Sequence, residues 1–450
     1  MKQLFNIKRL FYAGMVLTFI FPTLAVMAQE DLPPAGKPLA LEECIAIALK
    51  YHPSLGAGQA TLEAQRAKVE QALAAYYPQI DFKTTYSTAT ANYSSARSPA
   101  NSWNFNNFLS TGPSLNQLIY DFGRTTNSVK INRENAVASE QDLQTARQNI
   151  TLNVRQTYYG ALQSLALIKV AEETLTQNQQ RLTQAQGFFK AGTRSKIDVT
   201  KAEIDLANVQ LALIRAKNSY LVARANLNNA MGLQEGLRFA LVEAVDFNPT
   251  EVPLEKILQS AFTRRPEILQ LKAKQRSQEA AVELFRTGYY PTISGNLSNT
   301  WRTDEVPNDM AWDWSVGAAL TVPIFSGFST QNQIAEASAQ LRSLTAQEES
   351  LRQIIRLEAE QAYLNLHEAL ERIAVTRKSI DQAQENYNLA SGRYQVGAGQ
   401  TLEINDAEVL LANARANHIN ALYDYKTAQA RIEKAMGQTG SEISPQGKEK

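Results

Sequence analysis

The fold is decided by residues 330–391, which read TQNQIAEASAQLRSLTAQEESLRQIIRLEAEQAYLNLHEALERIAVTRKSIDQAQENYNLAS and contain neither glycine nor proline. As one unbroken helix this stretch would extend for roughly 90 Å, about three times the diameter of a small domain. A helix with only a narrow apolar stripe cannot be the core of a compact globule, so we expect it to lie against other long helices. The stripe recurs at steps of three, four or seven residues and consists of Leu341, Leu344, Leu351, Ile355, Ala362, Leu366, Ala369 and Ile373.

The chain is expected to turn back directly after this stretch. Gly397-Ala398-Gly399 interrupts the helical pattern, and a second helix is expected from about Thr401 to Met436. The two helices predict a long antiparallel hairpin. Its tip covers residues 394–403, and we call it the second tip.

The sequence contains a second copy of the unit that holds this hairpin. Tyr76-Tyr77-Pro78 recurs as Tyr289-Tyr290-Pro291, and Ala230-Met231-Gly232 recurs as Ala435-Met436-Gly437. Gly192 is the counterpart of Gly397 in the second tip. A register kept over so many positions is typical of a two-fold internal repeat. The first tip is therefore expected at residues 189–198.

Each unit is also expected to contain a lead-in helix and a pair of strands. The lead-in helix should be interrupted at Pro53 or Pro266, because the residue before a proline is disfavoured in the helical region. After each Tyr-Tyr-Pro sequence the apolar period changes from 3.6 to 2, which indicates strand hairpins at about 79–122 and 292–325. In the second unit the alternating apolar residues include Ile293, Leu297, Trp301, Trp312, Trp314, Val316, Leu320 and Val322.

The number of strands restricts how the sheet can be completed. Four strands leave two open edges and are too few for a closed barrel. Two interpretations remain from the residues alone. Several chains pool their strands in an outer-membrane barrel, or one chain forms a soluble four-stranded sheet packed on one face.

The composition excludes several classes of protein. The 45 basic and 44 acidic residues leave no net field that would attract nucleic acid. The three histidines do not have metal-ligand spacing, and no phosphate-binding loop or nucleophile motif is present. We therefore expect no enzyme, cofactor or metal site. The single cysteine, Cys44, is interpreted as a buried helix residue, and stability is expected to come from packing alone.

The expected division of the chain begins with a cleavable signal peptide at residues 1–28. Lys2, Lys8 and Arg9 precede a largely apolar stretch, and Val26-Met27-Ala28 offers small residues for cleavage. The remaining parts are an extended segment (29–38), the first repeat (39–232), a linker (233–252), the second repeat (253–437) and a polar tail (438–450). The fold class is mainly α with a β-barrel contribution.

These features together resemble the TolC family of outer-membrane efflux proteins, also called outer membrane factors. The resemblance rests on the two-fold repeat, the Tyr-Tyr-Pro sequences, the glycine-centred tips with acidic helix starts and the Ala-Met-Gly ends, and it covers residues 39–437. It implies a homotrimer with a 12-stranded barrel in outer-membrane lipid and a tunnel of 12 helices across the periplasm. It also implies a periplasmic membrane-fusion adaptor and an inner-membrane pump of RND or ABC type as partners, in multidrug efflux or type I secretion.

Both tips have a purely structural interpretation. Gly192 and Gly397 suit the left-handed position that ends a helix. Ser195, with Asp198 three residues later, predicts a capping box. Acidic residues in the first turn also stabilise a helix start by about 0.3–1 kcal/mol each.

The resemblance adds a functional interpretation of the same residues. Glu403 and Asp406 are three residues apart and share one helix face, so a trimer would hold two stacked rings of carboxylates. In the family this position faces the lumen at the closed periplasmic end. Asp198 and Tyr394 match positions with which family members tie the tips shut.

One departure from the family pattern concerns the second tip. Many members carry an arginine where this chain has Gly399, and we hypothesise that Arg194 of the first tip replaces it. The implied adaptor-docking residues are Gly192, Thr193, Arg194, Ser195, Gly397, Ala398, Gly399 and Gln400.

The leading function is therefore a passive gated conduit through the outer membrane and periplasm. The alternative is a periplasmic coiled-coil adaptor or a scaffold protein without a pore. An adaptor carries one helical hairpin and a lipoyl-like β-domain, whereas this sequence predicts two hairpins and paired strands.

Overall fold

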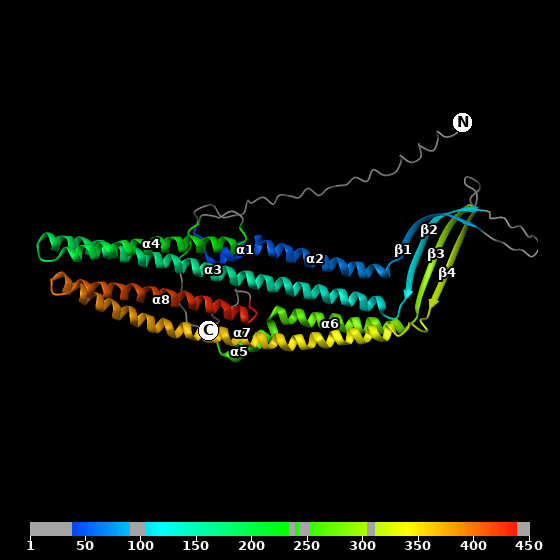
Figure 1. Cartoon of the computed structure of the whole chain (residues 1–450). Coiled ribbons are helices and arrows are strands. Elements are labelled where there is room, and N and C mark those ends of the chain that lie inside the picture. Colours follow the sequence, from blue (N-terminus) through cyan, green and yellow to red (C-terminus); the bar gives the residue numbers. More distant parts are fainter. Residues whose placement is uncertain (1–37, 91–104, 234–238, 243–251, 304–310, 439–450) are drawn as a thin grey trace, which may run out of the picture.

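The structure, a computed structural model, describes residues 38–90, 105–233, 239–242, 252–303 and 311–438. Two long helical hairpins dominate it (Figure 1). The first consists of α3 (Arg124–Lys190) and α4 (Lys196–Ala230), and the second of α7 (Ser329–Gln395) and α8 (Thr401–Ala435). Because α3 and α7 both have 67 residues and α4 and α8 both have 35, the expected two-fold repeat is confirmed. The expected signal peptide, residues 1–28, lies outside the described residues.

The lead-in helices break where proline requires it. In the first unit α1 (Leu41–Tyr51) is followed by α2 (Pro53–Leu73), and in the second α5 (Leu254–Arg264) is followed by α6 (Pro266–Arg286). A short 3-10 turn, η2 (Ala74–Tyr76) or η3 (Thr287–Tyr289), then leads into the strands. The predicted interruptions are therefore confirmed.

The four predicted strands form one antiparallel sheet in the order β1-β2-β3-β4. They are β1 (Gln79–Thr90), β2 (Phe105–Tyr120), β3 (Thr292–Thr303) and β4 (Ala311–Thr321). Figure 1 shows the sheet beyond one end of the helical part, with the two tips at the opposite end. No part of the chain that the structure describes covers the apolar side chains of β4, since Trp312, Trp314 and Val316 are 65%, 62% and 81% exposed.

The helices lie side by side as a curved layer in which α3 is central. Near the strands α3 packs between α2 and α6, and towards the tips it packs between α4 and α8. The predicted apolar stripe of α7 lies in the layer, because its residues from Ile355 to Ile373 are buried. Consequently α4 and α7 lie at the two edges of the layer, as β1 and β4 lie at the two edges of the sheet. None of the described helices is both long enough and apolar enough to cross a membrane.

The core of the first unit gathers around Tyr158 and Cys44. The Tyr158 hydroxyl lies 3.2 Å from the carbonyl oxygen of Leu39 and 3.0 Å from that of Val242, which joins the helices to the segments beside them. Cys44 is fully buried in α1, as expected, and this burial, with Glu43 and Glu42 nearby, raises the pKa of its thiol to about 12.

Candidate functional site

The two tips fold as the glycines require. Gly192 and Gly397 have φ of +73° and +75°, the left-handed conformation predicted for them. Thr193 N–H donates to the carbonyl of Phe188, and Ala398 N–H donates to that of Arg393. Each bond spans five residues, as in the Schellman motif that satisfies the last carbonyls of a helix.

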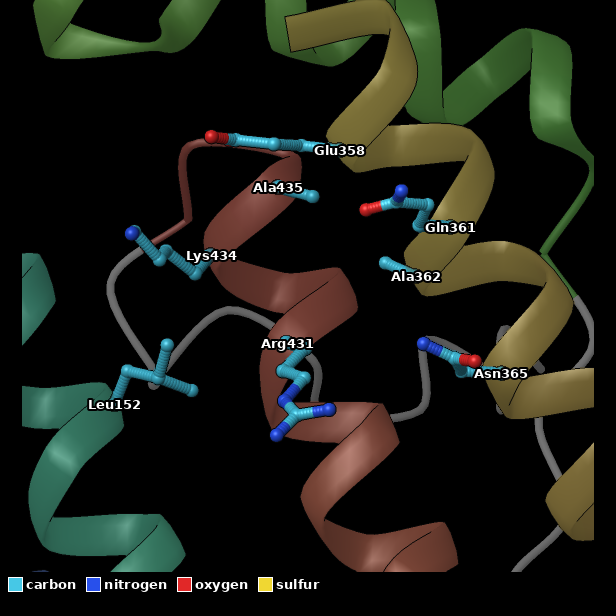
Figure 2. Close-up of a pocket in the computed structure, with 8 residues that line it drawn as sticks. All are labelled: Leu152, Glu358, Gln361, Ala362, Asn365, Arg431, Lys434 and Ala435. Carbon is cyan, nitrogen blue, oxygen red and sulfur yellow. The ribbon is translucent and has the colours of Figure 1, made fainter. Parts of the chain in front are cut away.

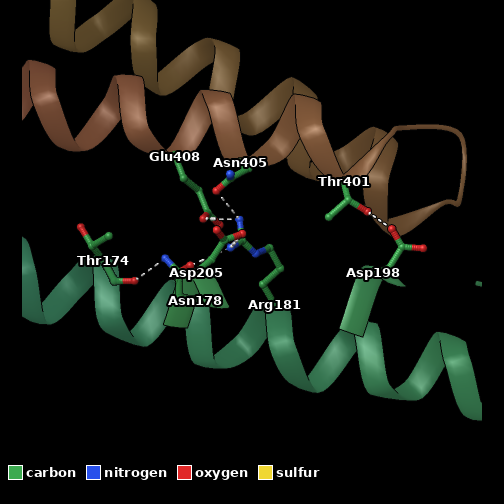
Figure 3. A network of polar contacts seen from close by, with 8 residues as sticks. All are labelled: Thr174, Asn178, Arg181, Asp198, Asp205, Thr401, Asn405 and Glu408. Carbon is green, nitrogen blue, oxygen red and sulfur yellow. Dashed lines mark hydrogen bonds and ion pairs between the residues drawn. The ribbon is translucent and has the colours of Figure 1, made fainter. Parts of the chain in front are cut away.

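The predicted capping box is not formed. No side chain caps the start of α4, and the Ser195 hydroxyl lies 3.3 Å from Oδ2 of Asp198. Oδ1 of Asp198 instead accepts a hydrogen bond of 2.7 Å from Oγ1 of Thr401, the first residue of α8 (Figure 3). The prediction failed because a tertiary partner from the other hairpin competes for this carboxylate.

Arg194 of the first tip reaches the second tip. Its Nη2 donates to the carbonyl oxygen of Gly399 at 2.6 Å, and its guanidinium carbon lies 4.9 Å from the ring centroid of Tyr394. Gly399 is buried, and a Cβ there would lie 3.0 Å from the backbone nitrogen of Tyr394. A larger residue at 399 would therefore require the neighbouring backbone to shift by a few tenths of an ångström.

Tyr394 does not bond to Asp198 in this structure. Its side chain is fully buried, packs edge-on against Phe188 at 5.9 Å between ring centroids, and has no hydrogen-bond partner for its hydroxyl among the described residues. The tips are therefore joined by Asp198–Thr401 and Arg194–Gly399, with Tyr394 packed between the hairpins.

The two acidic residues of α8 lie apart from these contacts. Glu403 and Asp406 are both exposed. Glu403 Oε2 lies 3.7 Å from Nε of Arg393, a pair whose side chains are both exposed and which water screens. Both carboxylates are therefore accessible to ions from the solvent. Most of the tip backbone is also accessible, and the exposed docking candidates are Gly192, Thr193, Ser195, Gly397, Ala398 and Gln400.

Sequence reasoning missed a buried polar cluster behind the tips (Figure 3). Its centre is Arg181, which is 2% exposed and donates to Asp205 and Glu408 at 2.8 Å each. Asn178 and Asn405 complete the cluster. One sequence signal pointed to this cluster, namely a charged residue on a helix face whose other residues are buried. Arg181 lies four residues before buried Ala185, and Glu408 lies four residues after buried Ile404.

A cleft of about 290 Å³ lies between α3, α7 and α8, far from the tips (Figure 2). No nucleophile paired with a base occurs in its lining, and Glu358 there accepts a hydrogen bond from Arg265. The described residues also contain no group of His, Cys, Asp or Glu side chains placed to hold a metal ion. The lining residues are Leu152, Glu358, Gln361, Ala362, Asn365, Arg431, Lys434 and Ala435.

Known proteins with similar sequences are channels and efflux components of bacteria. The chain is 23% identical to outer membrane protein TolC of Escherichia coli over 409 residues, 86% of this chain and 80% of that protein. It is 25% identical to the cobalt-zinc-cadmium resistance protein CzcC of Cupriavidus metallidurans over 449 residues, 96% of this chain and all of that protein.

Solved structures show the same fold. The outer membrane channel CmeC of Campylobacter jejuni superposes with a TM-score of 0.78 at 17% identity, over 88% of this chain and 85% of that one. A crystal structure of CusC gives a TM-score of 0.77 at 20% identity, over 89% and 92% of the two chains. The family model described as outer membrane efflux protein matches residues 44–233 and 257–438, most of both repeats. The chain belongs to the outer membrane efflux protein family.

Proposed function

We propose that three copies of this chain form the outer-membrane channel of a tripartite efflux or type I secretion system. The channel is a passive gated conduit, and a partner in the inner membrane supplies the energy. The observation that carries this proposal is that both the sheet and the helical layer end in edges that none of the described residues covers.

The edges of the sheet support a barrel closed between copies. β1 of one copy pairs with β4 of the next, so that three copies give 12 strands without an open edge. The outward apolar side chains then meet lipid, and the barrel lies in the outer membrane. They include Ile80, Phe82, Tyr86, Trp312, Trp314, Val316 and Leu320, all more than 60% exposed.

The edges of the helical layer support a closed tunnel in the periplasm. α4 exposes Ile197, Ile204 and Leu211 at seven-residue spacing on the side opposite to α3. α7 exposes Leu389, and Val396, directly after the end of α7 at Gln395, continues the same spacing. Such stripes are typical of helices that pack on another helix, so α4 of one copy packs on α7 of the next.

The tips are the end of the tunnel to which a membrane-fusion adaptor and an RND or ABC pump bind. In this proposal residues 1–28 are a signal peptide that is removed on export, and residues 39–232 and 253–437 are the two repeats of the mature chain. The exposed backbone turns at Gly192 and Gly397 offer docking sites at the far end from the membrane.

The gate of the channel lies at the same end. Asp198, Arg194 and Tyr394 hold the two hairpins of one chain together, as their contacts indicate. Glu403 and Asp406 line the constriction, where six carboxylates from three chains attract cations. Water and salt screen these charges, so their effect is larger on ion flow than on stability.

Ion conduction in planar bilayers tests this function. The wild-type trimer is expected to conduct with cation selectivity and to be blocked from the periplasmic side by hexaamminecobalt(III), a trivalent cation. Glu403→Ala with Asp406→Ala should abolish the block and weaken the selectivity. Glu63→Ala with Glu70→Ala is the matched control, since it removes two exposed carboxylates from α2, far from the tips.

Two results would contradict the proposal at different levels. A wild-type trimer that does not conduct ions is not a channel. If the double variant at residues 403 and 406 is blocked by hexaamminecobalt(III) at the same concentration as wild type, these acids do not line the path.

A further inference from the structure

The two hairpins of one chain meet along an interface that is largely polar. Gln163 bonds to Asn420 at 2.9 Å, and Glu173 pairs with Arg415. Within the second hairpin, by contrast, alanine, leucine and isoleucine side chains fill the space between α7 and α8. Polar contacts that water can replace allow two surfaces to separate, whereas an apolar core resists separation. The hairpins are therefore built to stay intact while their mutual interface opens.

The contacts that Arg181 makes in this interface are sheltered from water. Arg181 lies nine residues before the end of α3, about 14 Å from it along the helix. Its side chain is 2% exposed, that of Glu408 3% and that of Asp205 17%. The Glu173–Arg415 pair nearby has side-chain exposures of 60% and 26%. Burial makes the Arg181 contacts stronger than the exposed pair, because less water competes for the charges.

The partners of Arg181 come from both hairpins (Figure 3). Nη2 donates to Asn178 and Asp205 of the first hairpin, at 2.8 Å each. Nη1 donates to Asn405 at 3.1 Å and Glu408 at 2.8 Å, both in the second hairpin. If the hairpins separate, Arg181 keeps a carboxylate and an amide from its own side. Opening therefore does not leave an unpaired arginine charge, which would make separation far more costly.

We propose that Asn178, Arg181, Asp205, Asn405 and Glu408 form an internal latch that holds the second hairpin against the first, independently of the tip contacts. The latch has two satisfied states. In the closed state Arg181 bridges two carboxylates, and in the open state it keeps Asp205 while Glu408 moves into water. This inference rests on the proposed channel function and assigns part of the closed-state stability to residues outside the tips.

The charges in the closed latch predict how it responds to protons. One arginine faces two carboxylates, and α7 and α8 contribute Tyr387 and Arg415 to the same surroundings. Burial and the nearby Asp205 raise the pKa of Glu408, although Arg181 opposes this. Glu408 thus binds a proton more tightly in the closed state than in water. Acid therefore favours the closed latch. The stability that protonation of Glu408 adds to the closed state is lost as the pH rises through the raised pKa of Glu408.

Open probability in planar bilayers, measured on the full-length trimer, tests the latch. Arg181→Gln should raise the open probability about tenfold or more at about pH 7.5, because a charge-assisted hydrogen bond is lost. Glu408→Gln should lower it, because the amide imitates the protonated carboxyl and still accepts from Arg181. Arg286→Gln is the matched control and should leave it within about twofold of wild type, since its exposed pair with Glu283 lies on α6, outside both hairpins.

The opposite signs separate a latch from a structural role. Loss of packing alone would move Arg181→Gln and Glu408→Gln in the same direction. Wild type should close further as the pH falls from about 7.5 through the raised pKa of Glu408, and Glu408→Gln should lose most of that dependence. Unchanged heat resistance of the trimers shows that both variants fold.

The outcomes for the latch and for the channel are distinguishable. A wild-type trimer without ion flow overturns the channel function itself. A conducting wild type with the same open probability as Arg181→Gln overturns the latch alone, as does a Glu408→Gln variant that opens more readily.

Discussion

At the scale of single residues, two glycines explain why both repeats end in Ala-Met-Gly. Gly232 and Gly437 have φ of +75° and +74°. A Cβ at Gly232 would lie 2.7 Å from Cα of His52, and one at Gly437 would lie 2.9 Å from the carbonyl carbon of Arg264. Each long hairpin therefore ends against the break before Pro53 or Pro266. The break in the lead-in helix and the glycine fit each other.

This fit predicts a difference between two chemically identical substitutions. Gly192→Ala should lower the free energy of unfolding by only about 1 kcal/mol, because its left-handed φ is unfavourable for alanine but no atom lies within 4 Å. Gly437→Ala should lower it by roughly 2 kcal/mol or more, since the new methyl group also meets backbone atoms. Denaturation in guanidinium chloride measures both. Equal midpoints would contradict the close approach at Gly437.

At the scale of elements, Arg265 joins the break between α5 and α6 to the long helix α7. Its guanidinium donates to both carboxylate oxygens of Glu267 and, at 2.6 Å, to Glu358 of α7. Burial alone would raise the pKa of Glu267, but the hydrogen bonds and charge of Arg265 outweigh it and hold that pKa below its ordinary value. The first repeat has His52 at this position, so the contact is specific to the second repeat.

Removing this contact should destabilise the second repeat. Arg265→Gln is expected to lower the free energy of unfolding by about 2 kcal/mol near neutral pH, because Glu267 is left half-buried without its cation. Since the pKa of Glu267 is lowered in the folded chain, the difference from wild type should shrink as the pH falls through the carboxyl range. Arg286→Gln is the control, and its exposed pair with Glu283 should contribute less than about 0.5 kcal/mol. An equal loss in both variants would contradict the argument.

The elements themselves could be predicted from the sequence. Sixty or more residues without glycine or proline require a helix of that length, and strict alternation after Pro78 and Pro291 requires strands. Because the unit occurs twice, each helix or strand boundary could be predicted from two copies of the sequence. The second strand of the hairpin expected at about 79–122 was found as β2 (Phe105–Tyr120), as the repeat symmetry requires.

The candidate site could be predicted only in part. Backbone conformation at Gly192 and Gly397 follows from residue type, so it was predicted correctly. The partner of Asp198 did not follow, because the choice between Ser195 and Thr401 depends on how the hairpins are placed. Arg181 was missed for the same reason, as its partners are 24 and 227 residues away.

At the scale of the whole molecule, the proposed trimer makes each chain one segment of a tube. The sheet edge at β1 continues through α2 on one side, and the edge at β4 continues into α7 on the other. Each edge carries surface that a second copy would cover, namely unpaired strand groups in the sheet and apolar stripes on α4 and α7. One rotation that joins β1 to β4 therefore also joins α4 to α7, which favours a closed ring over an open filament.

A charge in the helical stripe should break this assembly. Ile204→Asp places a carboxylate where Ile204, 57% exposed in the single chain, is proposed to pack on α7 of the next copy. Each of the three interfaces loses roughly 2 kcal/mol of apolar burial and gains a buried charge, so trimers should dissociate at a lower temperature. Gln210→Asp adds the same charge to an exposed position of α4, about a third of a turn from Ile204, and should leave the trimer intact. Light scattering in detergent, combined with gel mobility after heating, gives the mass of each assembly.

If Ile204→Asp trimers withstand heat as well as wild type does, α4 does not face α7. If wild type is a stable monomer with its full strand content in plain buffer, the sheet has no need of its neighbours, and the tube is the wrong assembly.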